Sequence, residues 1–502
     1  MKLTARLSGV LLSILLALGM GLRLGHLDQR SMWTDELFTL AVAQYHPLVP
    51  KAGGPNYRRI QVMEISDTDT FLTAKAAEQS PPLNDLLEKV SVTWLGTTEI
   101  AARLPAALLA CSLLLWFASF AWHQREPQLR RVLHWSVFLL VLYPVLLMYA
   151  QEGRPYSAGA SFIGMGGLLW MLRWRDGWRP WCPPSWTEIL LLCLASLTHY
   201  NATLLVALLL LPDAVMTIRQ RSPQGGIRLG AIGFLVFTWI TLNAHAIFFT
   251  AKGGVAWGTA GTWYQVLETS TLDALATLHP YWLGLAAALL LAMIGMNYLG
   301  KQQEKYVAHL VAQRLCALAA LTVIYLALAG KVAATAGMDH PRYFIFIIPF
   351  VAVAIAMVLA EIRSVWIALA VALAFVTLAP ASMRLDKSLN IDDFRGMSLA
   401  AIQGSDHDTV FLYPLPPLRD VYRVSLHRYL DADPIHHMVE IGTVQDVIRV
   451  CEQLKAKNHV VALGYVWGQS MIDSVYGTCG QQWPNRSSEK FHNTFAEHWR
   501  AK

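Results

Sequence analysis

Two adjacent carboxylates, Asp35 and Glu36, stand shortly after the first long apolar run of the chain. They follow Trp33, a residue type that favours the membrane–water interface. An acidic pair beside hydrocarbon is costly and must be balanced by a partner or used for a task. A carboxylate in this position can take a proton from an attacking hydroxyl, as a general base. The plain alternative is a solvated loop that carries two acids.

Further polar side chains stand at the ends of later apolar runs. They are Arg103, Glu152, Arg154, His199, Tyr200, Asp339, His340, Arg342 and Tyr343. Guanidinium groups hold phosphate through paired hydrogen bonds and keep their charge. Fixed cations also stabilise the negative charge that develops on a phosphate leaving group. Together with a carboxylate base, these residues indicate transfer of a group from a lipid phosphate to a hydroxyl.

Each of these side chains also has a purely structural interpretation. Glu152 and Arg154 could pair only with each other, and His199 could be a hydrogen-bonded hinge residue. Arg103 and Arg342 could be interfacial arginines whose head groups reach toward water. We favour the functional interpretation because the topology predicted from charge places all of them on the same, non-cytoplasmic side of the membrane.

The composition predicts a membrane protein. Apolar residues make up 55% of the 502 positions and charged residues 15%, whereas soluble domains average about 25% charged residues. The formal charge of +6 comes from basic residues in short loops between apolar runs, which is not a nucleic-acid signal. The six cysteines have no metal-type spacing. Cys451 and Cys479 lie in the polar tail and could form a disulfide outside the cytoplasm.

The elements that must position the polar residues are membrane-spanning helices, and we expect about 11 crossings. The apolar runs lie near residues 3–25, 104–122, 132–150, 155–172, 185–217, 229–250, 279–299, 313–330, 341–360 and 364–381. Arginine-rich loops at 125–131, 173–179 and 219–228 are assigned to the cytoplasm, together with the N-terminus of an uncleaved first span. Run 185–217 is too long for one crossing, so we expect two short helices hinged at 198–201. The odd count places the C-terminal tail outside.

The sequence predicts two domains. Residues 1–381 form a mainly α, polytopic membrane domain that includes a first exterior loop, 26–103, with helices at the membrane surface. Residues 382–502 read as a small periplasmic α/β domain. Its expected strands are 409–413 and 459–465, and its expected helices are 420–430 and 443–457. The insertion between residues 44 and 80 could form a lid or an acceptor site.

Five stretches of the chain resemble the integral-membrane glycosyltransferases of the GT-C superfamily, in the bacterial branch related to glycosyltransferase families 39 and 83. That branch includes protein O-mannosyltransferases and the aminoarabinose transferase that modifies lipid A. The stretches are Trp33–Glu36, Pro81–Leu83 followed by 96–105, Tyr149–Tyr156, Thr198–Tyr200 and Pro341–Tyr343. The likeness covers about residues 10–360. Ser80 departs from it, since many relatives have a histidine there, and so does Asn84-Asp85, where relatives often have aromatics.

The resemblance implies the GT-C fold and an inverting transfer of a sugar from a polyprenyl-phosphate carrier to a hydroxyl of a lipid, glycan or protein. Asp35 would be the base that activates the acceptor, and Glu36 would support it or position the acceptor. Arg154 and Arg342 would bind the phosphate, and Tyr343 could add a hydrogen bond. Such an enzyme would lie in the bacterial inner membrane and act at its periplasmic face.

Neither an organic cofactor nor nucleic acid is expected. A monophosphate donor can be managed by arginine alone, whereas a pyrophosphate donor more often needs a divalent cation. If a cation binds, Asp35, Glu36 and Glu152 are the oxygen ligands that the sequence offers. Many relatives have a histidine at the position of Ser80. A role for that histidine in acceptor or metal binding therefore cannot be carried over to this chain.

Two other functions compete with the glycosyltransferase. A transporter or flippase would show internal repeats and interrupted helices near the membrane midplane, but the sequence has no repeat and its charges gather at one surface. A polymerase or ligase of surface polysaccharides typically uses a large, arginine-bearing exterior loop late in the chain. The acidic pair in the first loop disfavours that function.

Overall fold

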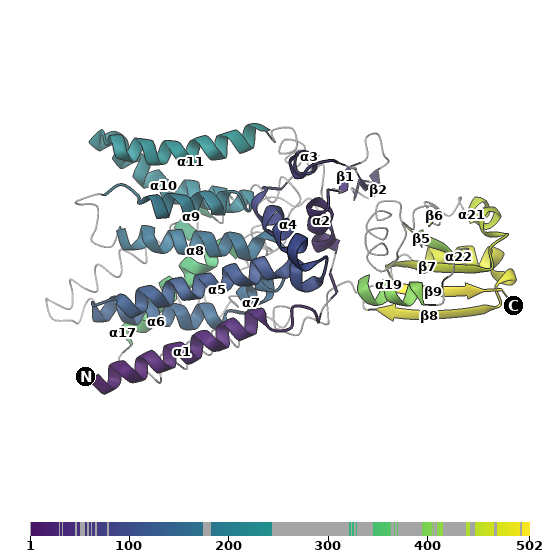
Figure 1. Cartoon of the computed structure of the whole chain (residues 1–502), viewed down its shortest axis with the longest axis horizontal. Coiled ribbons are helices and arrows are strands. Elements are labelled where there is room, and N and C mark those ends of the chain that lie inside the picture. Colours follow the sequence, from purple (N-terminus) through teal and green to yellow (C-terminus); the bar gives the residue numbers. More distant parts are fainter. Residues whose placement is uncertain are drawn as a thin grey trace. The chain divides into compact units, whose positions relative to one another are not determined.

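The computed structural model divides the chain into two compact units (Figure 1). The helical unit comprises residues 1–25, 79–87 and 103–385, and the sheet unit comprises 26–78, 88–102 and 386–502. The residues that the structure describes are 2–29, 31–32, 34–45, 48–50, 56–57, 60–61, 63–65, 68–77, 80–173, 182–242, five positions between 321 and 328, 345–362, 366, 369, 394–403, 405, 409–414, 438–441, 447–465, 469–491 and 494–501.

The helical unit is a bundle of apolar helices. They are α1 (Lys2–Leu24), α5 (Glu99–His123), α6 (Pro127–Leu142), α7 (Pro144–Ala150), α8 (Pro155–Arg173), α9 (Trp186–Ser196), α10 (Tyr200–Gln220), α11 (Pro223–Leu242) and α17 (Ile348–Glu361). Their core includes the fully buried Phe117, Leu140 and Leu205. Leu11 and Ile14 of α1 are 58% and 59% exposed. Apolar side chains that face outward in this way suit a bundle surrounded by lipid.

Among the described residues, α5 and α10 are long and apolar enough to cross a membrane. The pair α6 and α7 counts as a third span if the two helices are one broken crossing. The expected runs at 279–299, 313–330 and 364–381 fall largely or wholly outside the described residues. About 11 crossings therefore remains a prediction of the sequence.

Run 132–150, which we expected to form one span, is broken into two helices in the structure. Helices α6 and α7 meet at an angle of 58°, and the break lies at Tyr143, whose φ of −67° and ψ of 115° are extended. The cause is Pro144, which donates no backbone hydrogen bond and keeps the preceding residue out of the helical region.

The hinge predicted at 198–201 is confirmed. Helix α9 ends at Ser196 and α10 begins at Tyr200. His199 stands between them with extended backbone, and its Nδ1 accepts a hydrogen bond of 3.1 Å from the Asn201 backbone N–H. Such a bond satisfies one of the free N–H groups at the start of a helix.

An ionic network joins three helices of this unit. Arg173, at the end of α8, donates to Glu188 of α9 through Nη2 at 2.6 Å and through Nε at 3.1 Å. Its Nη2 also donates to Asp213 of α10 at 2.7 Å. Both carboxylates are almost wholly buried. The sequence had indicated Arg173 only as a basic loop residue, but its side chain compensates two buried negative charges.

The sheet unit contains a five-stranded sheet with the order β6-β5-β7-β9-β8. Its strands are β5 (Val410–Pro414), β6 (Met438–Ile441), β7 (His459–Tyr465), β8 (Asn485–Phe491) and β9 (Thr494–Arg500). Strands β6, β5 and β7 run parallel, and β9 pairs antiparallel with both β7 and β8. Helix α19 (Phe394–Ile402) contributes to one apolar layer of the unit. Helices α21 (Val447–Leu454) and α22 (Gln469–Cys479) contribute to the other.

The predicted strands at 409–413 and 459–465 are confirmed, and helix 443–457 is present in the shorter form of α21. The expected helix 420–430 lies outside the described residues. Cys451 and Cys479 form the disulfide that their position had suggested, with Cα atoms 5.7 Å apart. It fastens α21 to the end of α22.

Most of the first loop, residues 26–78 and 88–102, belongs to the sheet unit, and residues 79–87 belong to the helical one. The loop forms α2 (Thr34–Ala43), α3 (Phe71–Ala77) and α4 (Leu83–Leu95), which are the helices that we expected there. It also forms two small hairpins that the sequence did not indicate. Strand β1 (Leu48–Pro50) pairs with β4 (Met63–Ile65), and β2 (Asn56–Tyr57) pairs with β3 (Ile60–Gln61). Part of the insertion at 44–80 is therefore folded.

Two buried histidines connect the sheet to α19. Thr409 Oγ1 lies 3.1 Å from His459 Nδ1, and His459 Nε2 lies 3.0 Å from His498 Nδ1. His498 Nε2 lies 2.8 Å from the carbonyl oxygen of Ala400 in α19. A carbonyl only accepts, so His498 donates from Nε2. When this ring is neutral, its Nδ1 accepts from His459 Nε2. Each of these three hydrogen bonds needs one proton, and two neutral imidazole rings together with the Thr409 hydroxyl supply all three.

We expect the sheet unit to lose stability as the pH falls below about 6.5, the usual pKa of histidine. Burial is the main cause that lowers the pKa of His498; the Ala400 carbonyl and Glu489 oppose it, and Arg500 adds to it. The unfolded chain therefore binds a proton first, and the free energy of unfolding decreases as the pH falls from 6.5 toward the folded pKa. Above 6.5 this contribution is fully present.

The measurement is the thermal unfolding midpoint of the full chain between about pH 7.5 and about pH 5. The variant His498→Gln keeps a donor for the Ala400 carbonyl but cannot titrate, so its midpoint should depend less on pH. His123→Gln, a change at an exposed histidine, is the matched control. A wild-type midpoint that stays constant over this range would contradict the prediction.

Candidate active site

The acidic pair lies in the first turn of α2, in the sheet unit. The positive end of a helix dipole favours carboxylates in this position. Asp35 is partly exposed, whereas Glu36 is completely buried. Asp35 is therefore the member of the pair that a substrate could reach. Trp33 lies outside the described residues.

The base of α2 is fixed by apolar packing against the C-terminal part of the chain. Met32, Leu37 and Leu40 are fully buried in a cluster that also contains Met397 of α19 and Val461 of β7. All of these residues belong to the sheet unit. The helix that carries the acids is thus part of the same compact body as the C-terminal sheet.

The Gln-Glu-x-Arg loop connects α7 and α8 in the helical unit. Gln151 donates from Nε2 to the carbonyl oxygens of Leu22 at 2.6 Å and Gly25 at 3.0 Å. These carbonyls lie at the end of α1, where backbone acceptors have no partner within the helix. Gln151 therefore anchors the loop to α1, and leaves the adjacent Glu152, which is buried, and Arg154, which is partly buried, to face other groups.

Arg154 and His199 both lie near one aromatic ring, that of Tyr156. The Arg154 guanidinium carbon is 6.0 Å from the centre of the Tyr156 ring, at the outer limit of a cation–π contact. The His199 ring is 5.6 Å from the same ring and 5.0 Å from the ring of Phe346. The structure thus brings together the predicted loop 151–154 and the predicted hinge.

The Pro-Pro-Leu segment also joins this group. The Leu83 backbone N–H donates to the Leu197 carbonyl at 2.9 Å, directly before the hinge. Asn84 is 4% exposed, and its Nδ2 has no hydrogen-bond partner among the described residues. Gly159 of α8 allows the close approach, because a Cβ there would lie 2.6 Å from both Phe346 Cε1 and Thr198 Oγ1.

The remaining predicted residues are placed only in part. Arg103 is buried on α5, and Tyr200 opens α10. Arg342 and Tyr343, with the neighbouring Asp339 and His340, lie outside the described residues. Asp35 and Glu36 belong to the sheet unit, whereas Glu152 belongs to the helical unit. Among the described residues, no three His, Cys, Asp or Glu side chains form a group that could hold a metal ion.

The sequence did not identify two residues that organise the site. Tyr156 contacts both Arg154 and His199, although it was seen only as the last residue of a motif. Gln151 makes the anchoring bonds to α1, and was likewise seen only as part of the motif. The sequence pointed to Gln151 and Tyr156 only through their positions near Glu152 and Arg154 in the motif. Their partners are distant in sequence, so the contacts themselves could not be read from the motif.

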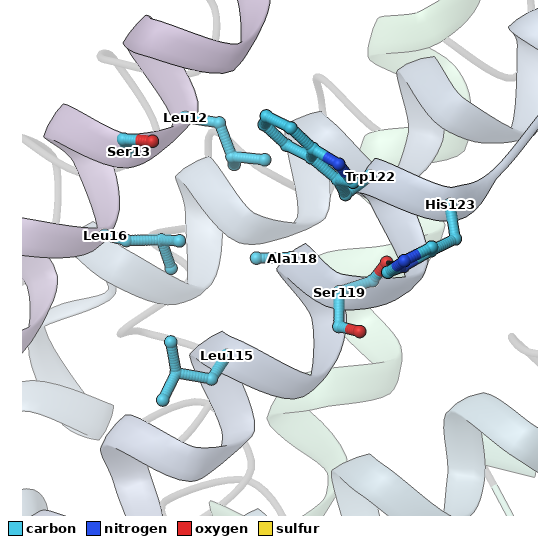
Figure 2. Close-up of a pocket in the computed structure, with 8 residues that line it drawn as sticks. All are labelled: Leu12, Ser13, Leu16, Leu115, Ala118, Ser119, Trp122 and His123. Atoms are coloured by element: carbon cyan, nitrogen blue, oxygen red, sulfur yellow. Dashed lines mark hydrogen bonds between the residues drawn. The ribbon is translucent and has the colours of Figure 1, made fainter.

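An apolar groove of about 270 Å³ lies between α1 and α5 and is open to the outside (Figure 2). Leu12 and Leu16 of α1 and Leu115 and Trp122 of α5 line it. None of the predicted site residues takes part in this lining. The groove therefore belongs to the outer surface of the bundle and not to the candidate site.

No protein-family model and no curated protein matches the sequence. Among solved structures, the crystal structure of ArnT from Cupriavidus metallidurans bound to undecaprenyl phosphate is similar over 97% of this chain and 97% of that chain, with 13% identity and a TM-score of 0.55. The apo structure of that ArnT (11% identity, 98% of both chains) and the oligosaccharyltransferase AglB from Archaeoglobus fulgidus (10% identity, 98% of this chain and 74% of that one) each have a TM-score of 0.43 and support no conclusion.

The match to the first ArnT structure establishes the fold, because it includes nearly the whole of both chains. The chain therefore has the fold of this ArnT structure, in agreement with the fold that the resemblance implied. At 13% identity the match does not establish the reaction, the substrates or the role of any residue.

Proposed function

We propose that this chain is a membrane glycosyltransferase that moves a sugar from a polyprenyl-phosphate carrier to a hydroxyl acceptor. The observation that carries the proposal is the fold shared, over 97% of both chains, with an ArnT structure that holds undecaprenyl phosphate. The motif residues Arg154, Tyr156 and His199, which the structure brings together, add independent support. The sugar is a hexose or a pentose, and the acceptor is a lipid, glycan or protein.

In the proposed reaction, Asp35 takes the proton of the acceptor hydroxyl as that oxygen attacks the anomeric carbon. The bond from this carbon to the phosphate oxygen breaks on the opposite face, so the configuration inverts. Polyprenyl phosphate leaves with the electron pair of the broken bond. Arg154 and Arg342 stabilise its developing charge, and Tyr343 adds a hydrogen bond.

The other predicted residues shape the site in this proposal. Glu36, buried beside Asp35, supports the base. Arg103, Glu152, His199 and Tyr200 bind substrate groups at the helix ends. The reaction requires no metal, and a divalent cation would serve a donor of higher charge.

We place the reaction at the periplasmic face of the bacterial inner membrane, with the N-terminus in the cytoplasm. The disulfide between Cys451 and Cys479 supports this orientation, because disulfides persist in oxidising compartments. The sheet unit contains both this disulfide and α2. The acidic pair would therefore face the same compartment.

A flippase of lipid-linked substrates is the second candidate. The breaks between α6 and α7 and between α9 and α10 favour it, because transporters bind substrates at interrupted helices. Both functions use the same class of lipid. They are distinguished by whether the bond between the sugar and the lipid phosphate is broken.

The test uses the purified full chain in proteoliposomes that contain polyprenyl-phosphate sugars extracted from membranes of the source cells. An extract of envelope lipids, glycans and proteins supplies the acceptor. Mass spectrometry follows free polyprenyl phosphate over time. We expect it to accumulate only when both extracts are present. Intact lipid-linked sugars that merely change leaflet would overturn the enzyme and favour the flippase.

A further inference from the structure

The beginning of the first loop and the beginning of α19 hold each other in place. The backbone N–H of Arg395, the second residue of α19, donates to Ser31 Oγ at 2.7 Å. The first N–H groups of a helix have no partner within it. Ser31 therefore caps α19, although it lies 364 residues earlier in the chain.

The Arg395 side chain returns along the same segment. Its Nη1 donates to the Asp28 carbonyl at 2.7 Å and its Nη2 donates to the Gln29 carbonyl at 3.1 Å. Nη1 also lies 3.9 Å from Glu99 Oε1, at the start of α5. One guanidinium thus binds two consecutive carbonyls, which its planar fork suits.

This clamp lies directly before the acidic helix. Ser31 and Met32 are buried, and α2 begins two residues later at Thr34. Met32 and Leu37 pack in the same cluster as Met397 and Ala401 of α19. Helix α19 therefore fixes the first turn of α2, which carries Asp35, in two ways. Hydrogen bonds hold the segment before α2, and apolar contacts hold α2 itself.

We propose that Arg395 is a positioning residue for Asp35, and that the C-terminal domain thereby holds the proposed catalytic acid in place. This inference rests on the proposed function for its consequence, but not for the clamp itself. Without the guanidinium, the Asp28 and Gln29 carbonyls lose their hydrogen-bond donor. The end of α2 that carries the acids then becomes more mobile. A displacement of about 1 Å at a reacting group can cost on the order of 100-fold in rate.

The first experiment needs no substrate. Hydrogen–deuterium exchange of the full chain in nanodiscs is compared between wild type, Arg395→Ala, Arg395→Lys and Ser31→Ala. We expect faster exchange over 28–43 in Arg395→Ala, an intermediate change in Arg395→Lys, and a milder effect in Ser31→Ala. Lys455→Ala removes an exposed cation from the same unit and should change nothing. Unchanged exchange in Arg395→Ala overturns the clamp.

The second experiment measures turnover with the membrane extract of polyprenyl-phosphate sugars. We expect Arg395→Ala to lower kcat by about 10- to 100-fold with an apparent KM within about threefold of wild type, because the acid is misplaced while the donor site is intact. Arg395→Lys should recover part of the rate. Faster exchange with unchanged kcat would overturn the positioning role.

The two hypotheses fail in different ways. If Asp35→Asn retains full turnover while exchange over 28–43 still responds to Arg395→Ala, the proposed base is wrong and the clamp stands. If Asp35→Asn abolishes turnover and Arg395→Ala changes neither exchange nor kcat, the base stands and the clamp is wrong. Should Arg395→Ala not fold, Arg395→Gln decides by the same two measurements, because it also removes the guanidinium that binds the Asp28 and Gln29 carbonyls.

Discussion

Replacing Asp35 with asparagine is expected to lower the rate of glycosyl transfer by about 100- to 10,000-fold, the usual contribution of a general base. Asparagine has nearly the same size and keeps a hydrogen-bonding oxygen, but it cannot take up the proton of the acceptor hydroxyl. Asp35 stands on the first turn of α2 and is partly exposed, so the change should leave the fold intact. The measurement is release of free polyprenyl phosphate under single-turnover conditions.

Two companion variants and one binding measurement separate the chemistry from other effects. Asp35→Glu keeps the carboxylate but moves it by one methylene group, so we expect a loss smaller than that of the asparagine variant. Asp69→Asn makes the same change at an exposed carboxylate in the same unit and should turn over like wild type. Binding of undecaprenyl phosphate should be unchanged in Asp35→Asn. Wild-type turnover in that variant would remove Asp35 from the mechanism.

Replacing Arg173 with methionine is expected to destabilise the helical unit by about 3–5 kcal/mol, the typical cost of removing one partner from a buried ion pair. Without the guanidinium, Glu188 and Asp213 remain as two neighbouring buried carboxylates. Methionine fills much of the same volume, so lost packing is a small part of the effect. The unfolding temperature in detergent should fall by on the order of 10 °C.

The control for the Arg173 variant is Arg219→Met, which removes an exposed arginine at the end of α10. It should leave the unfolding temperature nearly unchanged. Adding Glu188→Gln and Asp213→Asn to Arg173→Met removes the stranded charges and should recover most of the loss. If Arg173→Met alone unfolds at the wild-type temperature, the network does not stabilise the bundle.

Local signals in the sequence predicted the elements that depend on them. The hinge at His199 followed from a run too long for one crossing and too short for two full ones. Strands β5 and β7 followed from short, β-branched apolar runs. The disulfide followed from two cysteines in a polar tail. In each case the cause lies within the segment itself or in its general environment, so no knowledge of distant contacts was needed.

The features that the sequence did not reveal depend on partners far away in the chain. Strand β9 is buried on both sides and shows no alternation, while β8 is an exposed, charged edge strand. The attachment of α2 to α19 joins Ser31 to Arg395. The sequence indicates Arg173 only as a basic loop residue, because its partners Glu188 and Asp213 lie on other helices. The break before Pro144 is an exception, because its cause is local; we did not predict it since the run is apolar on both sides of the proline.

The motifs of the candidate site were predicted better than its architecture. The residues Glu152, Arg154 and His199 were identified by type and place, and the structure brings Arg154 and His199 to one ring, that of Tyr156. The sequence predicted two domains but assigned the first loop to the membrane domain, because that loop carries no signal that it groups with residues 386–502. Tyr156 and Gln151 were missed as organisers for the same reason.

The proposed enzyme requires that a carboxylate and guanidinium groups act on one lipid headgroup. The measurement that tests it is an electron cryo-microscopy structure of the full chain in nanodiscs with added undecaprenyl phosphate. We predict that the phosphate lies within about 3 Å of the Arg154 guanidinium, the distance of a hydrogen bond, and that Asp35 faces the same headgroup. A phosphate bound away from Arg154, or Asp35 on the opposite side of the membrane, would contradict the proposed enzyme.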